Sequence, residues 1–515
     1  MLYLPWMLAQ VHSFVLRGIE PVSCEVEVDV ADRGLPKTTI VGLPDAAVKE
    51  AIERVRSAMV NSGFPFPMSR LLVNLAPAEV KKEGPIFDLP IAVGLLLAER
   101  SIQTERHKRL LFAGELALDG RLRPVRGVIS LALLCKREGL DGVVVPVENA
   151  EEAAAVGVSV YPADSLATVV GFLNEQTELE GPPAVDLDAA VAGHGDGLAA
   201  GVDFADIRGQ ESVKRALTVA AAGAHNALMI GPAGTGKSLS AKALPTILPP
   251  LSRDEALEVT RIYSAVGLVP PGTALIARRP VRTPHHTASP VAVIGGGANP
   301  RPGEVSLAHH GVLFLDEMPE FPRAVLETLR QPLEDGHVTI ARAQTSIRFP
   351  ARFMLLAAMN PTPKGDAPTP GDEQSQRAME KYLSKLSGPL VDRIDIHVEV
   401  PPVPYAQLSA ARTGTDSRTM RREVLAARAR QAERLGDSVT PNAALSGRQL
   451  DAHAPMSESA KRLLQEAMST LGLSARAYDK VRRVARTIAD LAASDTLEAD
   501  HVAEAVQYRV LDRAM

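Results

Sequence analysis

A glycine-rich octapeptide, Gly231-Pro-Ala-Gly-Thr-Gly-Lys-Ser238, has the composition of a loop that binds phosphate. Successive backbone N–H groups of such a turn, together with the N-terminus of the helix that follows, wrap the phosphates of a nucleotide. In this pattern Lys237 reaches the β and γ phosphates, and Ser238 ligates Mg²⁺. An apolar run at 227–230 precedes the loop and a helical pattern follows it, as the motif requires. The octapeptide therefore predicts a nucleotide site formed by Gly231, Pro232, Ala233, Gly234, Thr235, Gly236, Lys237 and Ser238.

Polar residues follow two further apolar runs of the chain. Residues 311–315 are followed by Asp316 and Glu317, and residues 353–359 are followed by Asn360. In open α/β sheets ligands bind beyond the carboxyl ends of the strands, so we expect these side chains to converge on the phosphate loop. Asp316 would hold Mg²⁺ through water, Glu317 would orient the attacking water as general base, and Asn360 would orient it near the γ phosphate. The alternatives are a helix cap for the two acids and a plain turn for Asn360.

Composition and charge limit the classes of function. The chain has 515 residues, enough for about three domains with real cores. Its formal net charge of −5 gives no global attraction to nucleic acid, so DNA binding requires a local basic surface. The two cysteines, Cys24 and Cys135, offer neither a disulfide framework nor a metal cluster and indicate a reducing compartment. The N-terminus lacks a basic leader and the apolar run 89–98 is too short to span a bilayer, so we expect a cytoplasmic protein without membrane contact.

Patterns along the chain predict four regions. Residues 1–175 alternate strand and helix signals around an Asp-Gly hairpin turn, and we expect one compact α+β domain. Residues 176–200 are rich in Gly, Pro, Ala and Asp without periodicity, which is typical of a linker. Residues 201–402 alternate short apolar strands with helices, which predicts an α/β domain with a parallel sheet. Residues 403–515 are expected to form a small helical domain, with helical patterns at 421–435, 459–471, 475–492 and 499–510.

Five longer runs are specific enough to compare with known families. They are Val41-Gly-Leu-Pro-Asp-Ala-Ala-Val-Lys49, Val73-Asn-Leu-Ala-Pro77, Lys82-Glu-Gly-Pro85, Asp316-Glu-Met-Pro-Glu320 and Leu386-Ser-Gly-Pro-Leu-Val-Asp-Arg-Ile-Asp-Ile-His397. Together with the nucleotide motifs they resemble the ComM/YifB family of magnesium-chelatase-like AAA+ ATPases over nearly the whole chain. The resemblance implies a P-loop AAA+ core with a helical lid, preceded by a Lon-protease-like α+β domain. It also implies a hexameric ring that hydrolyses ATP with Mg²⁺ and binds branched or single-stranded DNA through its pore. Such a ring acts as a branch-migration motor or helicase in recombination and natural transformation.

The resemblance assigns roles to two arginines. Arg393 matches the family's arginine finger, which reaches the γ phosphate of a neighbouring subunit and neutralises charge in the transition state. The alternative is a surface salt bridge with Asp392 or Asp395. Arg476 matches the second sensor arginine, carried by the lid. Its competitors on the same predicted helix are Arg483 and Arg486.

The resemblance also points to the adenine and to DNA. Gly209 and Gln210 match the segment that lies along the adenine. Inserts at 291–303 and 336–348 match loops that point into the pore of the ring. Candidate contacts to DNA phosphates on these inserts are Arg301, Arg342 and Arg348. The alternative is that these arginines are only solvated charges on a hairpin.

The chain departs from the Lon-protease pattern at the residues that catalysis needs. The likeness to the Lon domain is clearest at Gly84-Pro85 and from Gly114 to Gly127. A Lon-type protease has a serine after that Gly-Pro and an activating lysine after the later glycine. This chain has Ile86 and Ile129 there, so we expect no proteolysis and a role in binding or assembly.

The chain also departs from its family after Asn360. Family members commonly continue with paired cysteines that resemble a four-cysteine zinc site. Here the positions hold Thr362 and Lys364, and 364–379 contains no cysteine or histidine, so we expect no zinc and a polar loop. The pairs His285-His286 and His309-His310 do not chelate a metal easily, because neighbouring side chains diverge on a strand or a helix. Local hydrogen bonding near the nucleotide is the better interpretation.

Two other functions compete with a DNA motor. A protein-remodelling motor like the magnesium chelatase ATPase subunit would share the ATPase core, whereas an ATP-dependent protease is opposed by the two isoleucines. The Lon-like N-terminal region favours the ComM/YifB pattern over the chelatase subunit.

Overall fold

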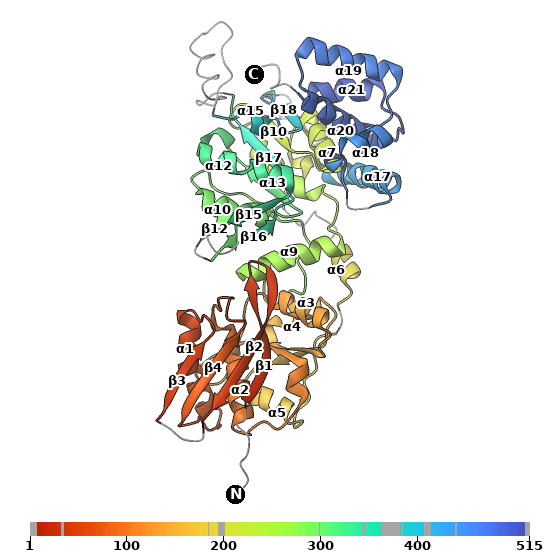
Figure 1. The fold of residues 1–515 in the computed structure, drawn as a ribbon. Coiled ribbons are helices and arrows are strands. Elements are labelled where there is room, and N and C mark those ends of the chain that lie inside the picture. Colours follow the sequence, from red (N-terminus) through yellow and green to blue (C-terminus); the bar gives the residue numbers. More distant parts are fainter. Residues whose placement is uncertain are drawn as a thin grey trace. The chain divides into compact units, whose positions relative to one another are not determined.

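The computed structural model describes residues 8–31, 35–183, 185–193, 201–297, 299–341, 346–361, 382, 385–405, 414–437 and 440–509. The chain forms two compact units (Figure 1). The first combines Met1–Ala190 with Ala256–Ile276, and the second combines Val191–Glu255 with Ala277–Met515. A segment from within the expected α/β region thus belongs to the N-terminal unit.

The N-terminal unit contains a seven-stranded mixed sheet in the order β3-β4-β2-β1-β5-β8-β9 (Figure 1). The strands are β1 (Leu8–Arg17), β2 (Glu20–Val30), β3 (Lys37–Val41), β4 (Arg70–Ala76), β5 (Leu110–Phe112), β8 (Gly142–Pro146) and β9 (Val160–Ala163). β2 pairs antiparallel with β1 and β4, and the other neighbours are parallel. Cys24, Val26 and Val28 are buried on one face of β2, as the alternation along this strand predicts.

Helices line this sheet and share its core. They are α1 (Ala46–Asn61), α2 (Asp88–Ala98), α3 (Val128–Glu138), α4 (Ala150–Ala154) and α5 (Leu166–Leu173), with a small hairpin of β6 (Glu115–Leu116) and β7 (Leu122–Arg123). α1 begins after Asp45, whose carboxylate accepts a 2.8 Å hydrogen bond from the Val48 amide. Val48, Ile52 and Val55 form its buried face in the core shared with α2. Helix α6 (Leu187–Gly193) lies in the stretch expected to be a linker.

The inserted segment of the N-terminal unit carries most of helix α9 (Arg253–Val266). Its C-terminal turn lies at the start of α3, where the Gly127 amide donates a 3.1 Å hydrogen bond to the Ser264 carbonyl. The buried Glu152 carboxylate accepts from the Ser264 hydroxyl and, at 2.9 Å, from the Ile129 amide. Burial raises the pKa of Glu152. Ile129 is therefore part of an apolar and hydrogen-bonded helix junction.

The second unit contains the expected parallel sheet, with five strands in the order β11-β14-β17-β10-β18 (Figure 1). The strands are β10 (Ala227–Ile230), β11 (Val281–Arg282), β14 (Val312–Leu315), β17 (Met354–Met359) and β18 (Ile396–Glu399). β10 lies between β17 and β18 and is parallel to both. Because all strands run the same way, the residues after β10, β14 and β17 lie at one edge of the sheet.

Helices and two inserts surround this sheet. The helices before the lid are α7 (Glu211–Gly223), α8 (Lys237–Ala243), α10 (Pro290–Ile294), α11 (Glu304–Leu307), α12 (Arg323–Thr328), α13 (Arg330–Asp335) and α15 (Gly388–Val391). The first insert contains the short ladder of β12 (Gly295–Gly296) with β13 (Arg301–Pro302). The second contains the antiparallel hairpin of β15 (His337–Ala341) and β16 (Ser346–Pro350).

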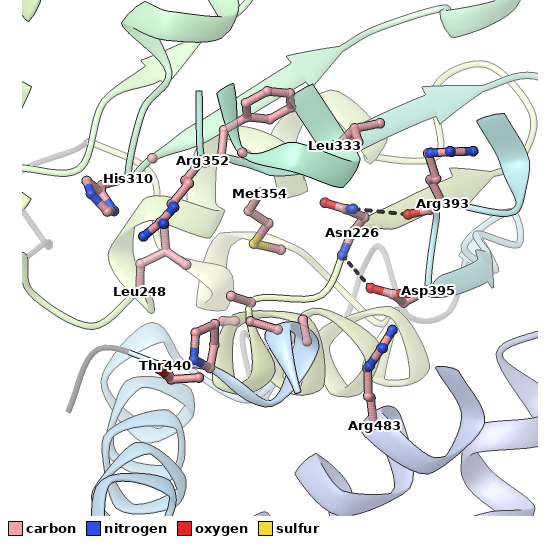
Figure 2. Close-up of a pocket in the computed structure, with 18 of the residues that line it drawn as sticks. Asn226, Leu248, His310, Leu333, Arg352, Met354, Arg393, Asp395, Thr440 and Arg483 are labelled. Carbon is pink, nitrogen blue, oxygen red and sulfur yellow. Dashed lines mark hydrogen bonds between the residues drawn. The ribbon is translucent and has the colours of Figure 1, made fainter. Parts of the chain in front are cut away.

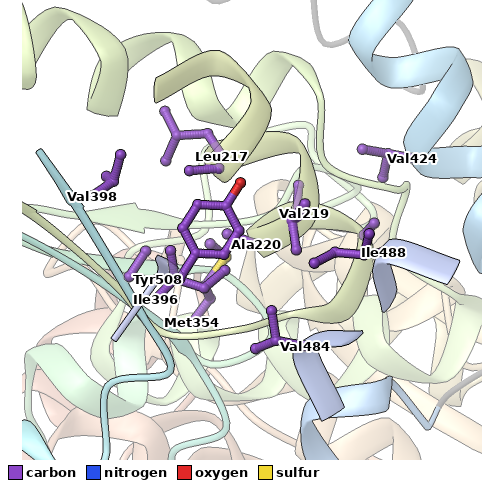
Figure 3. Packing of buried hydrophobic residues seen from close by; sticks show 14 of the residues in the cluster. Leu217, Val219, Ala220, Met354, Ile396, Val398, Val424, Val484, Ile488 and Tyr508 are labelled. Atoms are coloured by element: carbon purple, nitrogen blue, oxygen red, sulfur yellow. The ribbon is translucent and has the colours of Figure 1, made fainter. Parts of the chain in front are cut away.

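The C-terminal helices share one apolar core with the sheet. They are α17 (Ser417–Leu435), α18 (Gly447–His453), α19 (Glu458–Leu471), α20 (Ala475–Leu491) and α21 (Ala499–Gln507). Figure 3 shows Val424 of α17 and Val484 of α20 in this core, with Leu217 of α7 and Ile396 of β18. The lid is thus packed directly on the strands that carry the candidate site.

Among the helices in the described parts of the chain, none combines the length and the apolar character that crossing a bilayer requires.

Candidate active site

The phosphate loop connects β10 to α8, and its glycines are required by geometry. A Cβ on Gly231 would lie 2.2 Å from the Val400 carbonyl oxygen, so no side chain fits there. Gly234 and Gly236 have φ values of 77° and 94°, in the left-handed region that favours glycine. The Thr235 hydroxyl donates a 2.9 Å hydrogen bond to the Pro232 carbonyl and closes the turn.

Lys237 lies at the centre of this site and is only 8% exposed. Its ammonium donates to the carbonyls of Gly231 and Pro232, both at 2.7 Å, and to the Asn360 side-chain oxygen at 3.1 Å. Burial lowers the pKa of Lys237, and the charges of Asp316 and Glu317 oppose that shift. The structure thus brings the residues that follow β10 and β17 together.

The two acids after β14 complete this edge. The Ser238 hydroxyl donates a 2.7 Å hydrogen bond to Asp316 Oδ2. Glu317 is exposed and has φ 50° and ψ 47°, a left-handed conformation that costs a non-glycine residue about 1–3 kcal/mol. The side chain of Glu317 makes no cap hydrogen bond to the short 3-10 helix Met318–Glu320 that follows it. Backbone strain of this kind is concentrated at functional sites.

Gln210, which the resemblance assigns to the adenine, lies beside the loop. It has a φ of 59°, next to Gly209 with a φ of 63°. Its side-chain nitrogen donates to the Pro401 carbonyl at 2.5 Å and to the Thr235 carbonyl at 3.4 Å. Its side-chain oxygen is buried and has no hydrogen-bond partner among the described residues. A buried acceptor without a donor is costly, so this atom is suited to accept a hydrogen bond from a ligand.

Arg393 lies at the amino ends of the parallel strands, on the side of the sheet opposite to the phosphate loop. Figure 2 shows it in a cavity of about 1100 Å³ that is lined by residues preceding the strands, including Asn226 before β10 and Asp395 before β18. The guanidinium donates to the Pro389 carbonyl at 2.6 Å and pairs with Glu334 of α13. This hydrogen bond lowers the pKa of Glu334. A single copy of the chain therefore does not bring Arg393 to the phosphate loop.

The three candidate lid arginines have different surroundings. Arg476 is exposed and lines the same cavity as Arg393, and its charge acts on Glu334. Arg483 also lines the cavity, and its Nε donates to the Leu445 carbonyl at 2.7 Å. Arg486 is 1% exposed and is held by Asp490 at 3.1 Å inside the lid. Arg486 is thus a structural residue, and Arg476 and Arg483 face the cavity.

The candidate DNA contacts lie on the two inserts. Arg301 is exposed on β13. Arg348 is exposed on β16, where its guanidinium lies 2.9 Å from His337 Nδ1. Arg342 lies outside the described residues, as do Thr362 and the segment 364–379.

The two histidine pairs do not diverge as their spacing predicts. The ring centroids are 4.2 Å apart in His285-His286 and 3.9 Å apart in His309-His310. His310 has a φ of 54°, and this left-handed turn breaks the side-chain alternation assumed for a strand. The hydrogen bonding is local as expected, because His309 Nδ1 accepts a 3.0 Å hydrogen bond from the Arg352 amide, but His310 lines the cavity of Arg393 and not the phosphate loop.

Sequence reasoning missed the residues that hold the backbone of Arg393. Asn226 donates a 3.0 Å hydrogen bond to the Arg393 carbonyl, and Lys480 of α20 lies 3.3 Å from Asp395. The sequence allows Asp395 as a salt-bridge partner of Arg393, but in the structure Asp395 contacts Lys480 of the lid and His225 instead. No local motif marks Asn226 or Lys480, because their contacts join segments far apart in the chain.

Three family models match the chain. "Magnesium chelatase, subunit ChlI" matches residues 203–408, "Subunit ChlI of Mg-chelatase" matches 26–149, and "Magnesium chelatase, subunit ChlI C-terminal" matches 414–509. These matches include the sheet, the phosphate loop and the lid.

Relatives match over the whole length. The competence protein ComM of Haemophilus influenzae is 42% identical over 514 residues, which is 99% of this chain and 98% of that protein. The YifB protein of Escherichia coli is 41% identical over 510 residues, with the same coverage. The magnesium-chelatase 38 kDa subunit of Rhodobacter capsulatus is 30% identical over 177 residues, which is 31% of this chain and 50% of that subunit. The chain therefore belongs to the ComM/YifB family of magnesium-chelatase-like AAA+ proteins.

Proposed function

We propose that this protein is a Mg²⁺-dependent ATPase that works as a ring of identical copies, six in number, and acts on branched DNA. The observation that carries the proposal is the division of the candidate site. Lys237, Ser238, Asp316 and Asn360 converge at one edge of the parallel sheet, and Arg393 lies at the other. A ring that places the Arg393 edge of one copy against the loop of the next would complete the site.

The residues present fit ATP and Mg²⁺. The loop offers backbone N–H groups and a buried ammonium to phosphates, and Gln210 offers a buried acceptor to the amino group of adenine. Ser238 and Asp316 have oxygens 2.7 Å apart, and hydroxyl and carboxylate oxygens are ligands that Mg²⁺ prefers. When bound, Mg²⁺ neutralises charge on the β and γ phosphates.

The chain's own residues then have separate tasks in hydrolysis. Lys237 exchanges the loop carbonyls that it now contacts for phosphate oxygens. Glu317 accepts a proton from the attacking water, and Asn360 orients that water. Arg393 of the neighbouring copy leaves Glu334 and neutralises the charge that develops on the γ phosphate. Arg476 lines the same cavity, so we propose that it too serves the neighbour's nucleotide.

Action on DNA is supported by the relatives and by local charge. A full-length relative is named a competence protein. Arg301 and Arg348 are exposed on the two inserts of the ATPase unit, where they could contact phosphates without reading sequence. The net charge of −5 requires such a local surface. The Lon-like region, with Ile129 buried in a helix junction, is proposed to serve assembly or binding without proteolysis.

The rate of ATP hydrolysis should rise several-fold when branched DNA is added. The rise should decrease with salt, because phosphate contacts release counterions. The double substitution Arg301→Ala with Arg348→Ala should weaken the stimulation and leave the rate without DNA unchanged. A matched control is Arg109→Ala, which removes an exposed arginine paired with Asp141 in the N-terminal unit. Intact rings whose rate no DNA changes would refute the action on DNA and favour a protein-remodelling motor instead.

A further inference from the structure

The backbone on either side of Arg393 is held by a lysine of the lid. Lys480 of α20 donates a 3.3 Å hydrogen bond to the Ile394 carbonyl, and its Nζ lies 3.3 Å from Asp395 Oδ1. Lys480 is 8% exposed and Asp395 is 7% exposed. Burial acts to raise the pKa of Asp395, but Lys480 and His225 hold it below its ordinary value. Burial lowers the pKa of Lys480, and the charge of Asp395 opposes that shift. The two side chains therefore form a buried contact next to Ile394, the residue after Arg393.

Asn226, which directly precedes β10, holds the backbone of Arg393 from the side of the sheet. Asn226 donates from its side chain to the Arg393 carbonyl at 3.0 Å and from its backbone to Asp395 Oδ2 at 3.3 Å (Figure 2). The side-chain oxygen of Asn226 accepts a 2.8 Å hydrogen bond from the Leu355 amide of β17. These bonds fix the position of Arg393 relative to two central strands.

The C-terminal segment adds a third support. Arg509 donates a 2.7 Å hydrogen bond to the Ile394 carbonyl, so that one oxygen accepts from two cations of the helical region. Next along the chain, the His397 amide donates to the Tyr508 carbonyl at 2.8 Å. The loop of Arg393 is thus hydrogen-bonded both to the sheet and to the helical region.

We propose that the Lys480–Asp395 pair positions Arg393, so that the lid of one copy controls ATP hydrolysis in the neighbouring copy. The proposal rests on the shared active site proposed above. Lys480 lines the Arg393 cavity and contacts none of the described phosphate-loop residues. Loss of the pair should therefore slow hydrolysis at the neighbouring copy's nucleotide, to which Arg393 is delivered. It should leave the nucleotide site of the copy that carries the substitution unaffected. A displacement of a catalytic group by about 1 Å can lower the rate a hundredfold, so a small shift of the Arg393 loop is enough to slow hydrolysis in the neighbouring copy.

Rings that contain two different variants can distinguish an effect on a copy's own nucleotide site from an effect on its neighbour's nucleotide site. A donor copy carries Glu317→Gln, which removes its own general base and keeps Arg393. An acceptor copy carries Arg393→Ala, which keeps its own general base and needs a neighbour's arginine. Uniform rings of either variant should be nearly inactive, and mixed rings should hydrolyse ATP wherever a donor's Arg393 reaches an acceptor's nucleotide. Lys480→Met is then placed either in the donor or in the acceptor.

Lys480→Met in the donor should lower the rate of the mixed rings by about tenfold or more, and in the acceptor it should leave the rate within about twofold. Asp395→Asn should behave in the same way, because it removes the other partner of the pair. Lys480→Arg, which keeps the charge and the donors, should restore the donor. The matched control is Lys461→Met in the donor, which removes an exposed lysine of α19 paired with Glu458 and should change nothing.

The other outcomes each contradict the proposal. Equal losses in donor and acceptor would show that Lys480 only stabilises the copy that carries it. No loss in either would show that the pair does not position Arg393. If the two parent variants fail to restore activity to each other, the shared site itself is wrong, and the positioning role falls with it. ATP binding by the acceptor that carries Lys480→Met shows that this variant is folded.

Discussion

Glu317→Gln should bind ATP as the unaltered protein does and lose at least about a hundredfold in turnover. The amide keeps the size of the side chain but cannot accept the proton of the attacking water. Binding should persist because the side chain of Glu317 is exposed beyond β14, and Lys237, on which its charge acts, is retained. The measurement pairs single-turnover hydrolysis with equilibrium binding of a fluorescent ATP analogue.

Two matched variants define what this result means. Glu320→Gln removes a nearby acid that lies 3.4 Å from Lys385, and it should retain normal turnover. Lys237→Ala should abolish binding itself, since it removes the buried ammonium among the loop carbonyls. Normal turnover by Glu317→Gln would show that another group is the general base.

Arg393→Ala should lower turnover by about a thousandfold or more in assembled rings and leave ATP binding by the single chain unchanged. The separation of these effects follows from geometry, because Arg393 lies at the edge of the sheet opposite to the phosphate loop. Steady-state ATPase rates of rings, together with ATP binding at concentrations where the chain is a monomer, give the two quantities.

Arg418→Ala is the control for this change, since Arg418 is exposed on α17 and is not part of the cavity lining. Its turnover should equal that of the unaltered protein. Loss of ATP binding by monomeric Arg393→Ala would contradict the division of the site, because it would place Arg393 at the nucleotide of its own copy.

The geometry of the half-site that we propose binds phosphate could be predicted because it is local. The octapeptide 231–238 carries its own geometry in its glycines, and a parallel sheet necessarily brings Asp316 and Asn360 to the same edge. Helices α17 and α19 of the lid could also be predicted from the sequence, because Gly436 and Gly472 end them in left-handed conformations. The roles of these residues in catalysis stay predictions until they are tested.

The features that the sequence did not reveal depend on contacts between distant segments. The sequence pattern does not predict β1, because this strand is central in its sheet and is buried on both faces around Phe14, so it lacks a clear alternation. Helix α9 contacts the rest of the N-terminal unit through residues far apart in the chain, such as Ser264 with Glu152 and Arg261 with Glu20. The pairing of Arg393 with Glu334 and of Lys480 with Asp395 leaves no periodic signal.

The most direct measurement is an electron-microscopy structure of Glu317→Gln rings with ATP, Mg²⁺ and branched DNA. The proposal predicts six copies around the DNA, with Arg393 of each copy released from Glu334 and placed at the γ phosphate of the ATP held by the next copy's Lys237. A single copy, or rings in which Arg393 remains on Glu334 and no neighbour's arginine reaches the nucleotide, would contradict it.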